Sequence, residues 1–138
     1  MKTIIAGSRN IEEYQAILDA IEASGFEITE VISGGARGVD SLGERYGTEE
    51  GIPVKVFPAD WESDGRKAGI MRNKKMAAYA EALIAVMFNN SKGTSHMISE
   101  SIAKGLKVFV IEVELDESSK FRKSKIWYAN CERSCFDE

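Results

Sequence analysis

The chain has 138 residues, of which 43% are hydrophobic and 29% are charged, and its formal net charge is −4. These values are typical of one globular domain with a sizeable core, and they exclude a bulk electrostatic attraction to nucleic acid. No apolar run approaches membrane-spanning length, and residues 1–4 resemble the start of a strand rather than a signal peptide. We therefore expect a cytoplasmic protein without a membrane partner.

Strands and helices are predicted in alternation along the chain. Short β-branched or continuously apolar runs predict the strands, and apolar residues at helical spacing predict the helices. The predicted strands are residues 2–6, 30–33, 54–57, 82–88 and 107–111, and the predicted helices are the segment between Asn10 and Gly25 and residues 39–47, 66–80 and 94–104. Asn10 and Glu13 have the spacing of a helix capping pair. The alternation predicts an α/β fold in which about five parallel strands form an open sheet with helices on both faces.

The sequence from Glu112 onward is charged and weakly patterned, and a hairpin, a short helix and a dimer arm remain alternatives for it. It contains the two cysteines of the chain, Cys131 and Cys135. With His96 as the single histidine, they cannot complete a four-ligand zinc site in one subunit unless carboxylates join. We expect two reduced thiols and no metal site, with a zinc or disulfide link across a dimer as the alternative.

Three turns of small residues follow predicted strands. The carboxyl ends of parallel strands meet at one edge of a sheet, where such folds bind ligands. Glycine lets the backbone approach a ligand closely, and free N–H groups at a helix start attract anions. The turns are residues 7–9, 34–38 and 91–95, and their ligand-binding candidates are Gly7, Ser8 and Arg9; Gly34, Gly35, Arg37 and Gly38; and Gly93, Thr94 and Ser95. Together they predict a rim that binds an anion such as phosphate.

Five sequence blocks resemble the SLOG superfamily, and above all its YspA/YpsA-type branch. They are residues 6–9 (Ala-Gly-Ser-Arg), 33–40 (Ser-Gly-Gly-Ala-Arg-Gly-Val-Asp), 57–61, 69–76 and 93–94. The resemblance implies a Rossmann-like nucleotide-binding domain over residues 1–111, with residues 112–138 as a C-terminal extension. It also implies a nucleotide or a ribose-phosphate derivative as the small-molecule ligand, with no other cofactor required.

Five further assignments concern single side chains. Arg37 is expected to face a phosphate, because an arginine at a helix start opposes the helix dipole unless an anion is present. Arg72 is a second phosphate candidate, and Asn73 could bind a ribose or phosphate or cap a local backbone group. Asp40 could accept from a ribose hydroxyl or tie the glycine turn to its neighbours. Trp61 could stack on a base or belong to the core.

The phosphoribohydrolases called LOG, which belong to the same superfamily, offer a test for catalysis. Arg72 stands where their arginine would be, but Met97 occupies the position of their glutamate, three residues after Thr94. Methionine cannot transfer a proton as a carboxylate does, and Glu100 lies one helical turn further on. The resemblance therefore favours a binder over an enzyme, with Arg72 and Glu100 as the catalytic candidates if the chain is a hydrolase.

We therefore expect a sensor, carrier or sequestering protein for a nucleotide-derived ligand, acting as a homodimer. The first alternative is an N-glycosidic hydrolase of a nucleotide. The second is a single-stranded nucleic-acid binder, implied by the similarity of residues 33–40 and 72–74 to the DNA-processing protein A family. The net charge of −4 makes nucleic acid an unlikely partner.

Overall fold

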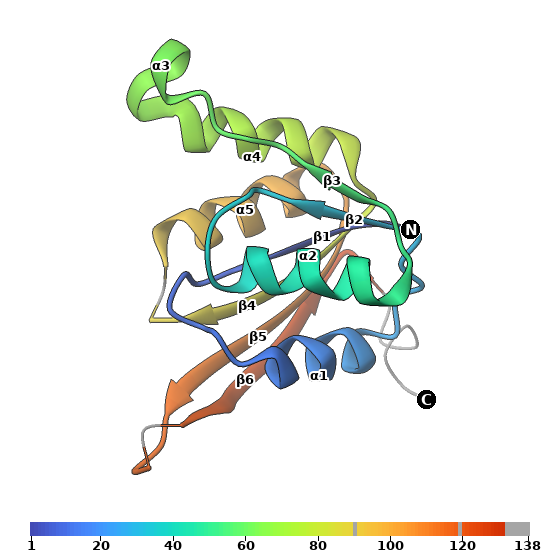
Figure 1. Ribbon diagram of the computed structural model, residues 1–138, viewed down its shortest axis with the longest axis vertical. Helices are drawn as coiled ribbons and strands as arrows, with labels where there is room; N and C mark the ends of the chain where they lie inside the picture. Colours follow the sequence, from blue (N-terminus) through green and yellow to red (C-terminus); the bar gives the residue numbers. More distant parts are fainter. Residues whose placement is uncertain (90, 119, 132–138) are drawn as a thin grey trace.

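One six-stranded sheet organises the molecule (Figure 1). The computed structural model describes residues 1–89, 91–118 and 120–131. The strand order is β3-β2-β1-β4-β5-β6, with parallel pairing throughout except for the antiparallel pair β5–β6. The strands are β1 (Lys2–Gly7), β2 (Glu30–Ser33), β3 (Val54–Val56), β4 (Ala82–Phe88), β5 (Lys107–Leu115) and β6 (Phe121–Ala129). The predicted open parallel sheet of about five strands is confirmed for β1–β5, and the structure adds an antiparallel strand, β6, at its edge.

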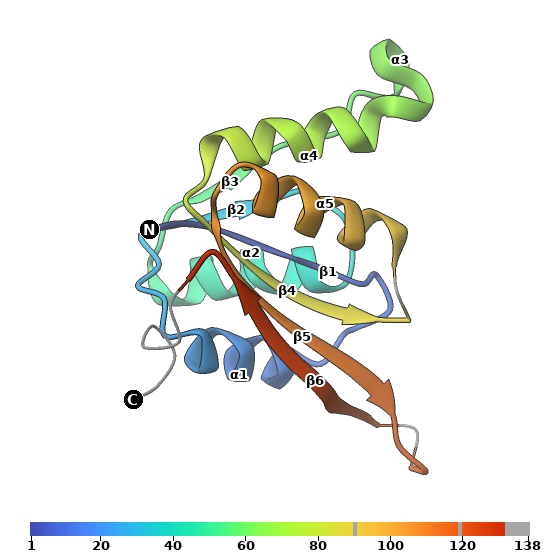
Figure 2. The same cartoon turned by 180° about the vertical axis from the view of Figure 1, so that it is seen from behind.

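Helices cover both faces of the sheet, as Figures 1 and 2 show from opposite sides. Helices α1 (Tyr14–Ser24) and α2 (Val39–Glu50) lie on one face, and α4 (Ala68–Tyr79) and α5 (Lys92–Ala103) lie on the other. The short helix α3 (Trp61–Asp64) and the 3-10 turn η1 (Gly65–Lys67) precede α4 and project from the body of the protein. This arrangement leaves the carboxyl ends of the central strands open between α2, α4 and α5.

Packing of apolar side chains on both faces of the sheet fixes the positions of the central strands. Side chains alternate along β1, so Ile4 packs with Met76 and Met97 on one face of the sheet, while Ile5 packs with Ile17 on the other. Residues 82–87 of β4 are buried, as expected for a strand covered on both faces. Each large apolar side chain buried in this way stabilises the fold by about 1.5–3 kcal/mol. The central strands therefore form a rigid base for the turns that follow them.

The start of α1 differs from the prediction. The helix begins at Tyr14, and its N-cap residue, Glu13, makes no side-chain capping hydrogen bond, so the predicted Asn10–Glu13 capping pair is wrong. The reason is the segment before it: Ile11 is fully buried, and its N–H lies 3.4 Å from the Ser8 carbonyl oxygen. Burial of Ile11 keeps the chain in a loop there and leaves Asn10 exposed beside the end of β1.

The segment beyond residue 112 forms a hairpin, one of the three alternatives open from the sequence. Strand β5 continues to Leu115, so the boundary placed after residue 111 falls within it, and β6 returns alongside. The indole N–H of Trp127 donates to a Glu112 carboxylate oxygen at 2.8 Å. The ring of Phe121 packs edge-to-face on Phe88 of β4, with 5.1 Å between centroids. The hairpin is thereby attached to the end of a central strand.

Two further expectations concern cysteines and membranes. Cys131 is disulfide-bonded, so the expectation of a reduced thiol at this position is wrong; Cys135 lies outside the described residues. Within the described ranges, no helix has the length and apolar character needed to span a membrane.

Candidate functional site

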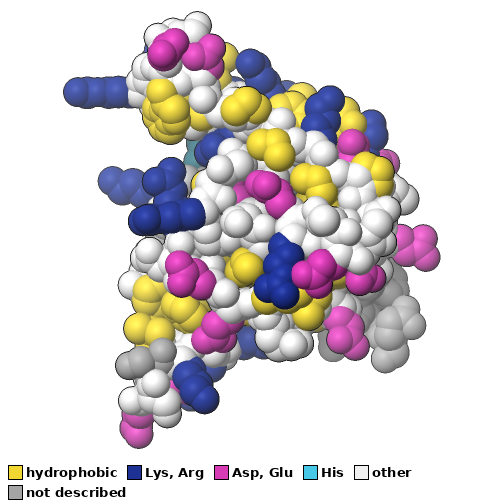
Figure 3. Space-filling view, in the orientation of Figure 1, with side chains coloured by type: hydrophobic (Ala, Val, Ile, Leu, Met, Phe, Trp, Pro, Cys, Tyr) yellow, Lys and Arg dark blue, Asp and Glu magenta, His cyan; other side chains and the backbone are white. Residues whose placement is uncertain are grey.

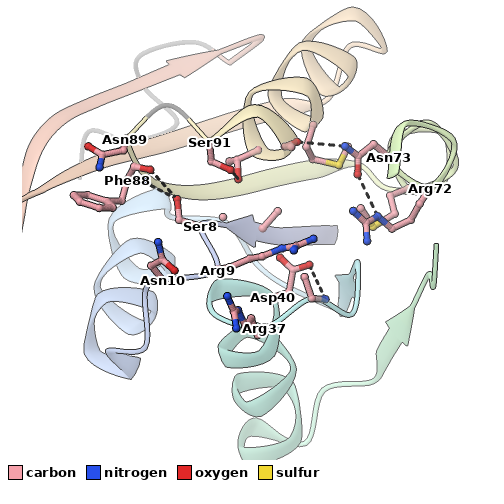
Figure 4. A pocket seen from close by; sticks show the side chains of 17 residues that line it. Ser8, Arg9, Asn10, Arg37, Asp40, Arg72, Asn73, Phe88, Asn89 and Ser91 are labelled. Carbon is pink, nitrogen blue, oxygen red and sulfur yellow. Dashed lines mark hydrogen bonds between the residues drawn. The ribbon is translucent and has the colours of Figure 1, made fainter. Parts of the chain in front are cut away.

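A cavity of about 440 Å³ opens at the carboxyl edge of the sheet (Figure 4). Its walls come from the ends of β1 and β4, the glycine turn before α2, the inner side of α4 and the start of α5. Small-molecule sites typically have volumes of about 300–1,000 Å³, so the cavity has the size of a ligand site. Ligands of open α/β sheets bind beyond the carboxyl ends of the strands, and the cavity lies at this edge.

The turn between β2 and α2 can form only because of a glycine. Gly38 has φ +77°, and a Cβ atom there would lie 2.4 Å from the Ser8 carbonyl oxygen. That same oxygen accepts a hydrogen bond from the Val39 N–H at 3.2 Å. A side chain at position 38 would therefore separate the start of α2 from the end of β1. The close contact brings Arg37 and Asp40 to the cavity.

Ser8 fastens the two central strands together at the cavity. Its hydroxyl donates to the Phe88 carbonyl oxygen at 3.2 Å and accepts from the Phe88 N–H at 2.8 Å. Its own N–H donates to the Val86 carbonyl oxygen at 3.1 Å. Ser8 lines the cavity, but its hydroxyl already has two protein partners.

Asp40 is a buried carboxyl group in the cavity wall. One of its oxygens accepts from the Ala36 N–H at 3.2 Å, which ties the glycine turn to α2. Burial raises the pKa of Asp40 to about 6, although the Ala36 hydrogen bond and the positive charge of Arg72 act to lower it. Asp40 therefore changes charge near neutral pH, where an ordinary aspartate stays ionised.

This pKa predicts a pH-dependent contribution to stability. An Asp40 proton is released near pH 3.8 in the unfolded chain and near pH 6 in the folded one. Between these values the folded state binds more protons, so the free energy of unfolding falls as pH rises through this window. We expect Asp40→Asn to remove this part of the pH dependence. Urea unfolding at about pH 4.5 and about pH 7 measures it; an identical pH response in both proteins would contradict the expectation.

Arg72 and Asn73 connect α4 to both neighbouring turns. The Arg72 guanidinium donates to the Gly34 carbonyl oxygen at 2.9 Å and to the Asn73 side-chain oxygen at 3.4 Å. The buried Asn73 amide donates to the Gly93 carbonyl oxygen at 3.3 Å and lies 3.1 Å from Nδ1 of His96. Because the amide nitrogen is a donor, Nδ1 of His96 accepts. Both residues line the cavity, and both also hold its walls together.

Arg9 and Arg37 are the unpaired cations of the site. Both line the cavity with exposed side chains, and neither forms an ion pair or a side-chain hydrogen bond with the described part of the chain. In Figure 4 the Arg9 side chain points toward Asp40 and Arg72. Figure 3 shows Lys and Arg side chains gathered along the edge where the strands end. The cavity lining thus holds three arginines, Arg9, Arg37 and Arg72, and one carboxyl group, Asp40.

The structure brings most of the sequence-predicted site residues together. The cavity lining includes Gly7, Ser8, Arg9, Arg37, Asp40, Arg72, Asn73, Gly93 and Thr94, but not Gly34, Gly35, Gly38, Trp61 or Ser95. The three glycines outside the lining shape the turn behind it. Trp61 lies on α3 with 58% of its surface exposed, so it is not a core residue.

Several lining residues were not named as ligand-binding candidates, although Ala36 and Ser91 belong to the turns predicted to form the rim and Met97 was placed at the position of the catalytic glutamate. They are Ala6, Asn10, Ala36, Met76, Phe88, Asn89, Ser91 and Met97. Phe88 and Asn89 stand at the carboxyl end of β4, so the strand-end rule could have identified them. Asn10 and Met76 come from a loop and a helix whose orientation is set by tertiary packing. Asn89 adopts φ +56°, which is uncommon for a residue other than glycine.

Comparison with known proteins places the chain among its relatives. The model of the YspA, cpYpsA-related SLOG family matches residues 1–63. The Gene 61 protein of Mycobacterium phage D29 is 33% identical over 117 residues, which cover 78% of this chain and 93% of the phage protein. The chain belongs to the YspA-related SLOG family. The family match includes the turns with Arg9 and Arg37, whereas Arg72 and α5 lie beyond it.

A solved structure supports the same fold for this SLOG protein. DNA processing protein A (DprA) from Streptococcus pneumoniae superposes with a TM-score of 0.65 at 14% sequence identity. The match covers 86% of this chain and 52% of DprA, so the chain spans about half the length of that protein. The likeness confirms the Rossmann-like architecture.

Proposed function

We propose that this SLOG protein binds a phosphorylated nucleoside-type ligand, a nucleotide or a ribose-phosphate derivative, in the cavity at the carboxyl edge of the sheet. The observation that carries the proposal is the excess of arginine there. Arg9 and Arg37 have no anionic partner in the described part of the chain, and Asp40, whose pKa is raised by burial to about 6, is the one acidic residue of the lining. A phosphate would supply the missing negative charge, since planar guanidinium groups bind its oxygens in pairs.

The remaining features of the cavity also suit such a ligand. Helix α5 starts with Lys92 and Gly93, and its N-cap residue, Ser91, makes no side-chain capping hydrogen bond. The first N–H groups of α5 are therefore available to an anion, with the helix dipole in the favourable direction. Gly93 and Thr94 of this turn line the cavity opposite the Arg37 turn. A phosphate between the two helix starts would contact both.

Native mass spectrometry of protein purified from cells tests the proposal. We expect a retained mass that matches a nucleotide or a ribose phosphate, together with a dimer as the assembly state. A retained ligand without phosphate would contradict the proposal. The assembly state is measured in the same spectrum and tests the expected homodimer separately from the ligand.

We expect the protein to act as a sensor, carrier or sequestering protein and not as an efficient hydrolase. Met97, which the sequence resemblance places at the position of the phosphoribohydrolase glutamate, lines the cavity. Glu100 is absent from the lining, and its carboxylate lies 3.8 Å from Nε2 of His96. Chromatography of nucleoside monophosphates after long incubation should show little free base. Turnover of about 1 s⁻¹ or faster, within the usual enzyme range, would instead favour hydrolysis. Loss of that turnover in Asp40→Asn or in Glu100→Gln would then identify the catalytic acid.

Binding of single-stranded DNA is the remaining alternative, and the likeness to DprA is the observation that favours it. Arg72 is engaged with the Gly34 carbonyl oxygen, while Lys67, Lys74 and Lys75 are exposed on η1 and α4. Backbone-driven binding would weaken with salt, with a log–log slope of about −0.7 per neutralised phosphate. We expect fluorescence anisotropy at physiological salt to show no sub-micromolar binding. Tight binding that is lost in Lys74→Glu would replace the nucleotide proposal.

A further inference from the structure

The short helix α3 and the turn η1 form an arm, residues 61–67, that extends beyond the body of the protein (Figures 1 and 2). Within the fold, α3 packs mainly against η1 and the start of α4. Gly65, with φ +58°, separates the helix from the turn. The arm supplies no residue to the cavity lining, so ligand binding in the cavity leaves its side chains without a role.

Large hydrophobic side chains are exposed on the arm and on the first turn of α4. Trp61 exposes 58% of its surface, and Ile70 and Met71 expose 43% and 39%. The Trp61 ring lies along the start of α4, with its Cη2 atom 3.9 Å from the point that a Cβ atom of residue 69 would occupy. Tryptophan and methionine are enriched in protein interfaces, and tryptophan is a frequent anchor at their centre. The arm and the first turn of α4 therefore present an apolar contact surface.

Four charged side chains follow Trp61 in a self-complementary order. The acidic pair, Glu62 and Asp64, belongs to α3, and the basic pair, Arg66 and Lys67, belongs to η1. None of the four forms an ion pair with a described residue. Figure 3 shows acidic, basic and hydrophobic side chains exposed together on the arm. The arm thus carries both signs of charge, each without a counterpart in the described part of the chain.

A second copy of this chain is the partner that fits this order of charges. In a two-fold contact, residue i of one copy meets residue j of the other, and j meets i. Two arms in antiparallel orientation would therefore place the acidic pair of each copy opposite the basic pair of the other, on both sides of Trp61. A partner surface with one sign of charge would instead repel half of the arm, and like charges brought together at an interface weaken association strongly.

We infer that the arm is the contact surface between two copies of this protein, with Trp61 as its apolar anchor and the acidic and basic pairs exchanged across a two-fold axis. The inference gives a surface to the homodimer expected above, and it does not depend on the ligand of the cavity.

The test exchanges the charges in two variants and measures association by sedimentation velocity over a series of protein concentrations. The first variant, Glu62→Lys with Asp64→Lys, makes the arm wholly basic. The second, Arg66→Glu with Lys67→Glu, makes it wholly acidic. The control, Glu12→Lys with Glu22→Lys, changes the net charge as the first variant does, at exposed positions in and beside α1.

We expect wild type and the control to dimerise alike, and each charge variant alone to associate at least roughly tenfold more weakly. An equimolar mixture of the two charge variants should form a heterodimer, because the basic arm then meets the acidic one. A monomeric wild type, a dimer that survives both charge changes, or a mixture that does not associate would overturn the inference.

Trp61→Ala tests the anchor separately from the charges. Truncation of a central interface residue should weaken dimerisation roughly thirtyfold or more. Leu115→Ala is the matched control, since Leu115 is also exposed, at 49%, but belongs to the hairpin. Circular dichroism checks that each variant is folded. Equal dimerisation of Trp61→Ala and wild type would contradict the anchor role. No ligand enters these measurements, so their failure would leave the proposed ligand binding to its own test.

Discussion

Gly7→Ala is expected to prevent stable folding. A Cβ atom at this position would lie 2.0 Å from the Val86 carbonyl oxygen and 2.7 Å from Cγ2 of Val39. The oxygen is main chain, and it also accepts the hydrogen bond from the Ser8 N–H, so it cannot move without opening the β1–β4 pairing. The loss should exceed about 4 kcal/mol, a large fraction of the roughly 5–15 kcal/mol that stabilises a domain. Denaturant unfolding measures it, or soluble yield if the variant does not fold.

Gly69→Ala is the matched control for this substitution. Its added Cβ would meet its nearest neighbours, the ends of the Arg72 and Trp61 side chains, at 3.9 Å, an ordinary contact. Because Gly69 lies in α4, alanine should raise stability by up to about 1 kcal/mol. A Gly7→Ala protein as stable as wild type would show that the ends of β1 and β4 are not packed as described.

The double variant Arg9→Ala, Arg37→Ala should lose most of the affinity for a phosphorylated ligand. A hydrogen bond to a charged group contributes about 1.5–3 kcal/mol, so each arginine accounts for roughly ten- to hundred-fold in affinity. Both side chains are exposed and unpaired within the described ranges, so the stability of the fold should be unchanged. Calorimetric titration measures the affinity, and thermal unfolding measures the stability.

Arg45→Ala is the control for the change in net charge. Arg45 lies on the outer side of α2, where it forms an exposed ion pair with Glu49. Removing it changes the net charge without altering the cavity lining. If Arg45→Ala weakened binding as much as the Arg9 and Arg37 changes do, the effect would be one of long-range charge and not of contact in the cavity.

The sequence predicts the parallel sheet well because its signals are local. A continuously apolar run such as residues 82–88 indicates a strand covered on both faces, and small residues at strand ends mark the ligand edge. The Asn10–Glu13 pair shows the limit of such signals. Its spacing fits a helix cap, but burial of Ile11 competes with helix formation and delays the start of α1 to Tyr14.

Site residues that come from elements far apart in the sequence are harder to predict than residues of one turn. Arg37 and Asp40 belong to one recognisable turn, so their place beside the cavity follows from the sequence. Asn10 and Asn89 are far apart in the sequence, and they line the same cavity only because β1 and β4 are neighbouring strands. The support of Phe88 by Phe121 depends on the hairpin, whose charged and weakly periodic sequence leaves several structures open.

The most direct measurement is thermal unfolding of the wild-type protein with a panel of nucleoside mono-, di- and cyclic phosphates, ADP-ribose and ribose 5-phosphate. A ligand that binds the folded state and is present at about 100 times its dissociation constant adds about 2.7 kcal/mol of stability. We predict a shift of this size with at least one member of the panel, and its loss in the Arg9→Ala, Arg37→Ala variant. No shift with any member, and no ligand retained in the purified protein, would contradict the central claim that the cavity binds a phosphorylated nucleoside-type ligand.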